Sequence, residues 1–136
     1  MKPSVAATYP LRWAHWWLAA GGALVALVAV LSLMPAPPEM GGSDKLAHLS
    51  AYASLALWFA GIYRSSRYAA ILLGLLLFGV AIEILQGLGG SRQPEFADAA
   101  ANLAGIVFGL ALGKLGLGGW CARVERVLLP GVGDGG

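Results

Sequence analysis

The chain is poor in cysteine, the residue that cross-links small folds through disulfides and carries redox chemistry. It holds a single cysteine, Cys121, among 136 residues, which excludes an internal disulfide framework and a CxxC metal or redox motif. Charged residues are scarce at 12%, and the formal net charge of +2 is too small and too dispersed to indicate nucleic-acid binding. Hydrophobic residues make up 58% of the chain, well above the average for a soluble globular domain. This composition predicts an integral membrane protein.

Four apolar runs have the length that a membrane crossing requires, about 20 residues for each helix. They are separated by the prolines of residues 35–38, the arginine loop 64–67 and the glycines of residues 87–90, and Pro94 suits the first turn of the last helix. We therefore predict an all-α integral membrane bundle of about four transmembrane helices. It forms a single membrane domain over residues 1–136, with helices at about 13–34, 44–63, 68–88 and 95–117.

The first run also follows a positively charged start, as the apolar part of a signal peptide does. It is longer than that part usually is, and no clear A-x-A cleavage pattern precedes the prolines. We therefore predict an uncleaved first helix.

Lysine and arginine residues indicate the orientation. They flank the first helix, fill the loop after the second and follow the fourth, at Lys2, Arg12, Arg64, Arg67, Lys114, Arg123 and Arg126. Such residues concentrate on the cytoplasmic side of membrane proteins, so both termini are predicted to be cytoplasmic. Trp13, Trp16, Trp17 and Trp120 fit an aromatic belt at that interface.

The segment after the fourth helix has the pattern of a short amphipathic helix. Its apolar stripe consists of Leu117, Trp120, Val124, Val127 and Leu128, while Arg123, Glu125 and Arg126 lie elsewhere. This pattern predicts an interfacial helix over residues 117–129 on the cytoplasmic membrane surface. Residues 131–136 are expected to be disordered.

Nearly all polar side chains inside the membrane-length segments fall into two clusters. One cluster is Asp44, Lys45, His48 and Tyr52 on one helical face, and the other is Glu83, Gln86, Arg92, Asp98 and Asn102. With cytoplasmic termini and four crossings, the loops between the first and second helices and between the third and fourth lie outside. Both clusters lie near these loops, so we expect them to meet at the outer membrane face. Ionisable groups in a bilayer cost several kcal/mol unless they are paired or wetted, which indicates a functional site or a specific packing contact.

Glu83 is the deepest of these acids. It lies about 24 Å along the helix from Arg67, which is below the outer surface of a hydrocarbon core about 30 Å thick. A carboxylate at that depth stays charged beside a cation and takes up a proton without one. We predict Lys45 or Arg92 as its partner.

Gly105, Gly109 and Gly113 continue the stripe of Asp98 and Asn102 along the fourth helix. Small residues at this period let two helix backbones approach closely, which places the two polar residues inside the bundle. The same glycine face leaves a homo-oligomer open.

The whole pattern from Asp44-Lys45-Leu46-Ala47-His48 through Asn102 and Gly105 resembles the VanZ-like family of small bacterial membrane proteins. The resemblance covers about residues 42–113. It implies a multi-pass protein of the bacterial inner membrane whose motif residues are the nine polar residues of the two clusters. The family's prototype is associated with low-level resistance to teicoplanin, so the resemblance implies a role in glycopeptide resistance or envelope homeostasis.

Three functional classes remain open. The first is an outer polar site that binds an envelope lipid or a lipid-linked cell-wall precursor through the nine residues. The second is a membrane enzyme that modifies a lipid headgroup, with His48, Glu83 and Asp98 as catalytic candidates beside Asp44, but no recognisable nucleophile accompanies them. The third, a transporter or flippase, usually needs repeats and broken helices. No H-x-x-x-H or H-E-x-x-H pattern supports a metal held by His48, Glu83 and Asp98, so we predict neither a metal nor another cofactor.

Overall fold

The computed structural model describes residues 6–35, 43–90, 93 and 95–131. These residues form the helices α1 (Ala14–Leu33), α2 (Ser43–Ile62), α3 (Tyr68–Leu88), α4 (Phe96–Leu112) and α5 (Trp120–Leu128). A 3₁₀ turn at Ser65–Arg67 leads into α3, and a π turn at Gly113–Leu117 follows α4. The described part of the chain contains no β-strand beyond one isolated bridge between Thr8 and Tyr63. The predicted all-helical fold is therefore confirmed.

Three helical segments of the described chain are long and apolar enough to cross a membrane: Ala14–Leu33, Ser65–Leu88 and Phe96–Leu117. The prediction of four such segments is therefore not met. Helix α2 is long enough, at 20 residues, but it is not among the three segments. Asp44, Lys45 and His48 lower its hydropathy. The helix also has less need of an apolar surface, since it packs against α1, α3, α4 and α5.

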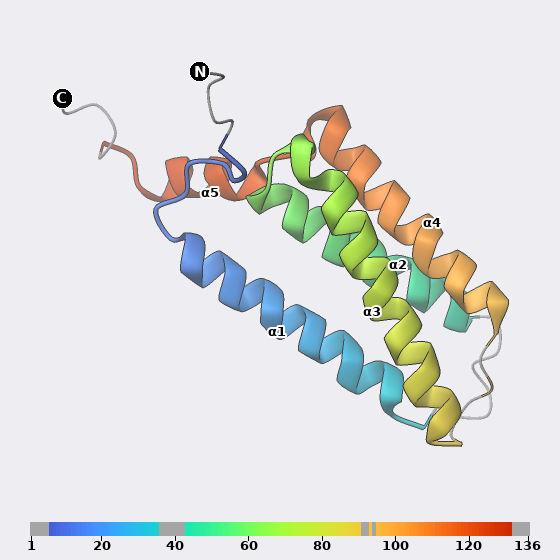
Figure 1. Cartoon of the computed structure of the whole chain (residues 1–136). Coiled ribbons are helices and arrows are strands. Elements are labelled where there is room, and N and C mark those ends of the chain that lie inside the picture. The colour runs from blue at the N-terminus through green and yellow to red at the C-terminus, as the bar shows by residue number, and fades with distance from the viewer. Residues whose placement is uncertain (1–5, 36–42, 91–92, 94, 132–136) are drawn as a thin grey trace.

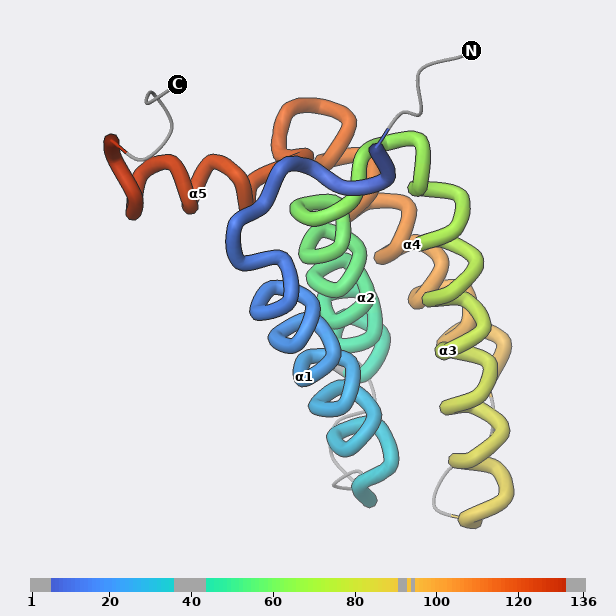
Figure 2. The backbone as a smooth tube through the Cα atoms, turned by 60° about the vertical axis from the view of Figure 1, so that its left-hand side comes forward, coloured from blue at the N-terminus to red at the C-terminus, as the bar shows by residue number. Residues whose placement is uncertain are grey.

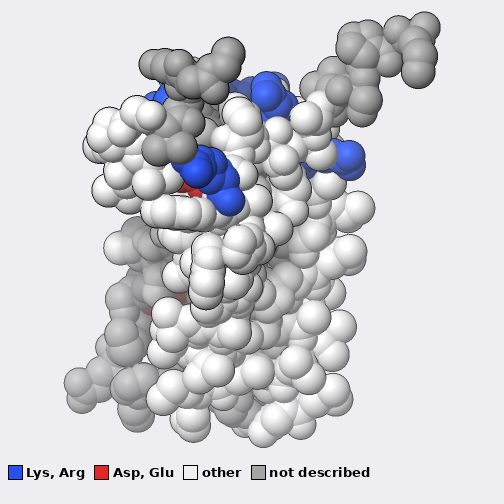
Figure 3. Space-filling view, turned by 90° about the vertical axis from the view of Figure 1, so that its left-hand side faces the viewer, with Lys and Arg blue, Asp and Glu red and all other residues white. Residues whose placement is uncertain are grey.

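Helices α1 to α4 form an elongated bundle, and α5 runs crosswise at one end of it (Figures 1 and 2). The described chain begins and ends at that same end, whereas α1 and α3 end, and α2 and α4 begin, at the opposite end (Figure 1). In the face shown in Figure 3, Lys and Arg side chains gather at the α5 end, and uncharged side chains cover most of the rest. This arrangement suits a protein whose flanks face lipid.

The core lies along α2 and α4. Its buried apolar side chains include Tyr52, Leu55, Ile106 and Leu110. The glycine stripe of α4 lies directly on α2: a Cβ atom added at Gly109 would meet the Ala53 carbonyl oxygen at 2.5 Å. The predicted close packing is confirmed.

The other two stripe glycines are equally crowded within this chain. A Cβ at Gly105 would meet the Leu49 carbonyl oxygen, and one at Gly113 would meet the Tyr68 hydroxyl. The glycine face is thus covered by the chain itself, and a second copy would have to dock elsewhere.

Helix α5 docks on the end of α2 through Trp120 and Cys121, and both side chains would collide with a Cβ atom at Gly61. The Trp120 indole donates a hydrogen bond to the Leu57 carbonyl oxygen at 2.9 Å. Val127 and Leu128 remain exposed, so part of the apolar stripe of α5 is not covered by the described chain.

The sequence pattern places Glu125 on the polar side of α5, and this prediction is wrong. Its side chain is buried and accepts hydrogen bonds from the backbone N–H groups of Arg12 and Trp13 and from the Trp17 indole. The error arises because a helical stripe describes one helix alone, whereas α5 also packs against the start of α1. Of the predicted disordered tail, residues 132–136 lie outside the described residues.

Candidate functional site

The structure brings polar residues of α2 and α4 together at the end of the bundle opposite α5. His48 and Tyr52 of α2 and Asp98 and Asn102 of α4 are all buried. Asp44, one helical turn before His48, is partly exposed. The sequence therefore identified residues that converge in space, although they lie about 50 positions apart.

Hydrogen bonding fixes the His48 ring. Its Nδ1 atom lies 2.9 Å from the Asn102 Oδ1 atom, and because an amide oxygen only accepts, Nδ1 carries the proton in this contact. The other ring nitrogen, Nε2, lies 3.8 Å from the Asp44 Oδ1 atom. Nε2 therefore faces the acids either as a lone pair or, when protonated, as the cation of an ion pair.

Two buried oxygen atoms beside this ring lack hydrogen-bond partners within the described part of the chain: the Asp98 Oδ1 atom and the Tyr52 hydroxyl. Leaving such a group unsatisfied costs about 1–3 kcal/mol, and more when it is charged. Buried polar atoms of this kind mark a place where a ligand can supply the missing contact.

Helix α3 comes close to the same residues at Gly79. A Cβ atom there would lie 3.1 Å from the Asn102 Nδ2 atom and 3.3 Å from the Tyr52 hydroxyl. The glycine therefore lets α3 close over the polar residues of α2 and α4. Glu83, one turn further along α3, is partly exposed.

Two predicted site residues have structural contacts elsewhere. Gln86 is buried and its Nε2 atom donates a 2.6 Å hydrogen bond to the Ser32 carbonyl oxygen, which ties α3 to the end of α1. Lys45 pairs with Glu95 at 3.3 Å, and both side chains are about half exposed, at 49% and 59%. Glu95 was missed by the sequence reasoning, since nothing in its local pattern indicates a partner 50 residues away.

The predicted partners of Glu83 were Lys45 and Arg92. Arg92 lies outside the described residues, so its pairing with Glu83 stays a prediction. Lys45 is engaged at the rim by Glu95, which leaves Arg92 as the stronger of the two predicted partners.

A pocket of about 180 Å³ opens between α1 and α2 beside the polar residues. Asp44, His48 and Tyr52 line one part of it. Apolar side chains line much of the rest, namely Val28, Leu31, Ala47 and Ala51. The pocket therefore offers charged and hydrogen-bonding groups next to an apolar wall.

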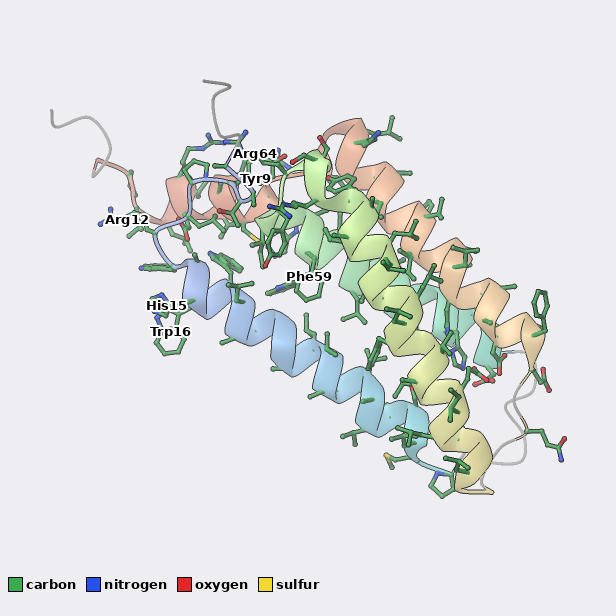
Figure 4. The ribbon with its side chains drawn as sticks, in the orientation of Figure 1. Tyr9, Arg12, His15, Trp16, Phe59 and Arg64 are labelled. Atoms are coloured by element: carbon green, nitrogen blue, oxygen red, sulfur yellow. The ribbon has the colours of Figure 1, made fainter. Side chains whose placement is uncertain are left out.

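A larger cavity of about 560 Å³ lies toward the α5 end, between α1, α2 and α3. Apart from Arg67 and Tyr63 its lining is apolar, and it includes Val25, Phe59 and Phe78. Figure 4 shows Phe59 in the space between α1 and α3, and Arg64 close to Tyr9 beyond it, where the guanidinium lies 5.0 Å from the tyrosine ring centre. The cavity can hold hydrocarbon but offers little chemistry.

One group of side chains has the composition of a metal site. Asp44, His48 and Asp98 each offer a ligand atom, and these atoms lie within 4.8 Å of one another. The sequence analysis weighed His48, Glu83 and Asp98 for such a site and set it aside for lack of a metal-binding motif; the group in the structure has Asp44 instead of Glu83.

Comparison with known proteins returned no matching family model, no matching curated protein and no matching solved structure. The function of this chain is therefore inferred from its sequence pattern and from the geometry of the site.

Proposed function

We propose that this protein binds the polar headgroup of an envelope lipid or of a lipid-linked cell-wall precursor in the pocket between α1 and α2. The observation that carries the proposal is the lining of that pocket, where Asp44, His48 and Tyr52 stand next to the apolar side chains of Val28 and Leu31. A lipid presents the same combination, a polar group joined to hydrocarbon.

The charges of the described site favour a ligand that donates hydrogen bonds. Asp44 and Asp98 are hydrogen-bond acceptors when ionised. Among the described residues the nearby cation is Lys45, and it is paired with Glu95 at the rim. Amine and sugar hydroxyl groups meet this need. The volume of about 180 Å³ is below the range of about 300–1,000 Å³ typical of complete ligands, so the pocket suits a headgroup whose chains remain in the bilayer.

The orientation belongs to the same proposal. We place the protein in the bacterial inner membrane as a multi-pass protein with cytoplasmic termini and with α2 as a fourth crossing. The Lys and Arg side chains at the α5 end support this orientation. The pocket then opens toward the outer leaflet, where glycopeptides act, and the family resemblance of the sequence suggests a contribution to teicoplanin-type resistance or envelope homeostasis.

A lipid-modifying enzyme is the second candidate. One observation favours it: the buried His48 ring is held by Asn102 and faces Asp44, as a general base is held in many active sites. Among the described side chains no serine near it is placed as a nucleophile, since Ser50 and Ser54 are exposed and the Ser54 hydroxyl donates a hydrogen bond to the Ser50 carbonyl oxygen. Water would have to act as the nucleophile, and we rank binding ahead of catalysis for this reason.

Two near-isosteric variants test the site. Glu83→Gln and Asp98→Asn keep size and remove charge, so a purely structural contact tolerates them. We expect both to lose the lipid that co-purifies with the wild type, measured by native mass spectrometry, and to lose the glycopeptide or envelope phenotype at normal protein levels. Ser54→Ala, which removes an exposed hydroxyl of α2 that does not line the pocket, is the control and should retain both.

His48→Gln separates the two candidate functions. A hydrogen-bonding amide can replace part of a ligand contact but cannot act as a base. Partial retention of lipid and phenotype supports binding. Retained lipid with a complete loss of phenotype supports catalysis, and wild-type behaviour of both acid variants would reject the site altogether.

A further inference from the structure

We propose that Asp44, His48 and Asp98 bind a divalent transition-metal cation, with one nitrogen and two carboxylate ligands. This proposal does not depend on the lipid proposed above, because it concerns the affinity of the protein for the ion alone.

The spacing of the three groups suits a shared ion. Bonds from a transition metal to histidine nitrogen or carboxylate oxygen are about 2.0–2.2 Å long, so two ligand atoms on one ion lie at most about 4.4 Å apart. The 3.8 Å between the His48 Nε2 atom and the Asp44 Oδ1 atom is too long for a hydrogen bond but falls within this limit. Ligand atoms in a tetrahedral site lie about 3.4 Å apart, so the widest separation in the group, within 4.8 Å, closes by up to about 1.4 Å through side-chain rotation when the ion binds.

Asn102 prepares His48 for this role. The amide oxygen accepts the proton of Nδ1 at 2.9 Å, which leaves the Nε2 lone pair directed toward the carboxylates. Histidine ligands of metals are commonly held in this manner by a hydrogen bond to the second ring nitrogen. In the neutral ring this lone pair faces carboxylate oxygen, and a cation between them is attracted to both.

Asp98 supplies an independent indication of a ligand. Its side chain is 5% exposed, and its Oδ1 atom has no hydrogen-bond partner in the described part of the chain. A buried carboxylate without a partner is unfavourable, and a metal ion satisfies it directly. Asp44 and His48 also line the pocket of about 180 Å³, which leaves an open coordination position for water or another small ligand.

The competing explanation is a proton. A protonated His48 between Asp44 and Asp98 would neutralise part of the acid charge without any metal. The two explanations differ in whether the protein binds a metal ion stoichiometrically.

The test uses the full chain, purified in detergent, with any affinity tag removed and with chelator removed by dialysis. Zn²⁺ is titrated and counted by elemental analysis, and Co²⁺ is titrated with its visible absorption as a report of nitrogen and oxygen coordination. We expect one ion per chain and a higher midpoint of thermal unfolding in its presence.

Variants then locate the ion. His48→Gln and Asp98→Asn should each weaken binding at least tenfold, and Asn102→Leu about 10- to 100-fold through loss of the ligand orientation. Ser54→Ala removes an exposed hydroxyl of α2 outside the group of ligand atoms and should bind as the wild type does. Circular dichroism of each variant checks that helix content is kept.

Failure of the folded wild type to bind either Zn²⁺ or Co²⁺ would overturn the proposal and favour the protonated histidine. Equal binding by the wild type and a folded Asp98→Asn variant would overturn it as well. Neither result bears on lipid binding, which has its own readout.

Discussion

At the scale of single residues, Glu125 shows how a buried carboxylate joins distant parts of the chain. Its two oxygen atoms accept hydrogen bonds from the Arg12 and Trp13 backbone N–H groups at 2.7 and 2.9 Å and from the Trp17 indole at 2.8 Å. These backbone groups lie just before α1, where a helix leaves N–H groups without internal partners. Glu125 therefore caps α1 from a helix more than 100 residues away.

The acid stability of this contact can be predicted from its pKa. Burial acts to raise the pKa of Glu125, but the hydrogen bonds from Arg12, Trp13 and Trp17, with the Arg12 charge, outweigh it and leave the pKa below its ordinary value. A carboxyl whose pKa is lower when folded stabilises the fold above the pKa of the unfolded chain, and the stabilisation is lost as the pH falls through the folded value. We expect α5 to detach below about pH 4.

Tryptophan fluorescence measures this step, because the Trp120 ring lies 5.4 Å from that of Trp17 and 5.1 Å from that of Trp58. Glu125→Gln should weaken the docking by about 1.5–3 kcal/mol at neutral pH, the range for hydrogen bonds to charged groups, and should remove the acid transition. Arg126→Gln, at an exposed neighbour, is the control. An acid transition that persists unchanged in Glu125→Gln would assign it to another group.

At the scale of elements, the contact between α2 and α4 decides where the site forms. Gly109 touches α2 so closely that an added Cβ atom would lie 2.5 Å from the Ala53 carbonyl oxygen and 2.8 Å from the Ala56 Cβ atom. Backbone cannot move away as a flexible side chain can. The close approach of the two helices also brings Asn102 within hydrogen-bond distance of His48.

Gly109→Ala should therefore destabilise the bundle by about 1–3 kcal/mol through overpacking. Gly74→Ala is a matched control in the middle of α3, since nothing lies within 4 Å of a Cβ atom there, and alanine is the better helix former. Thermal unfolding in detergent compares the two variants. Equal midpoints would show that the α2–α4 contact is looser than described.

The helix boundaries were largely predictable, because they depend on local chemistry. Prolines, glycines and the arginine loop bracket α1, α2 and α3, whose observed ends lie within one residue of the predicted ones. The fourth predicted helix matches the helical segment Phe96–Leu117, within which α4 ends at Leu112 and a π turn follows. Gly116 has a φ of +136° in that turn, a conformation that only glycine adopts readily.

The site was predictable in part. Helical spacing identified His48, Asp98 and Asn102 as residues of the bundle interior, because acids, amides and imidazoles are rare in apolar helices unless they face one another. The rotation of each helix about its axis decides which acid lies beside His48. It also decides that Lys45 pairs with Glu95. That rotation is set by tertiary packing, which no single-helix pattern contains.

At the scale of the whole molecule, charge and polarity are divided between the two ends of the bundle. Arg12 and Arg64 lie at the end that carries α5 (Figure 4), whereas His48, Asp98 and Asn102 lie toward the opposite end. An apolar flank separates them, with Leu27, Leu73, Leu77 and Val107 among its exposed side chains. A membrane-embedded flank explains why so many large apolar residues remain exposed.

The proposed orientation in the membrane is based on the positive-inside rule and can be tested by cysteine labelling in whole cells. Ser66→Cys marks the loop at the α5 end and Gln93→Cys the connection between α3 and α4, and both positions are exposed. The native Cys121 is a silent background, because it is fully buried and because burial, with the negative charge of Glu125, raises the pKa of its thiol to about 12. A thiol with such a pKa carries almost no reactive thiolate at neutral pH.

We expect a membrane-impermeant maleimide to label Gln93→Cys in intact cells and to label Ser66→Cys only after the membrane is opened. The wild type should remain unlabelled in both conditions until it is denatured, which checks that the signal comes from the introduced thiols. If Ser66→Cys is labelled in intact cells and Gln93→Cys is not, the protein has the opposite orientation. The pocket beside His48 would then open to the cytoplasmic leaflet, and a direct encounter with an external glycopeptide would be ruled out.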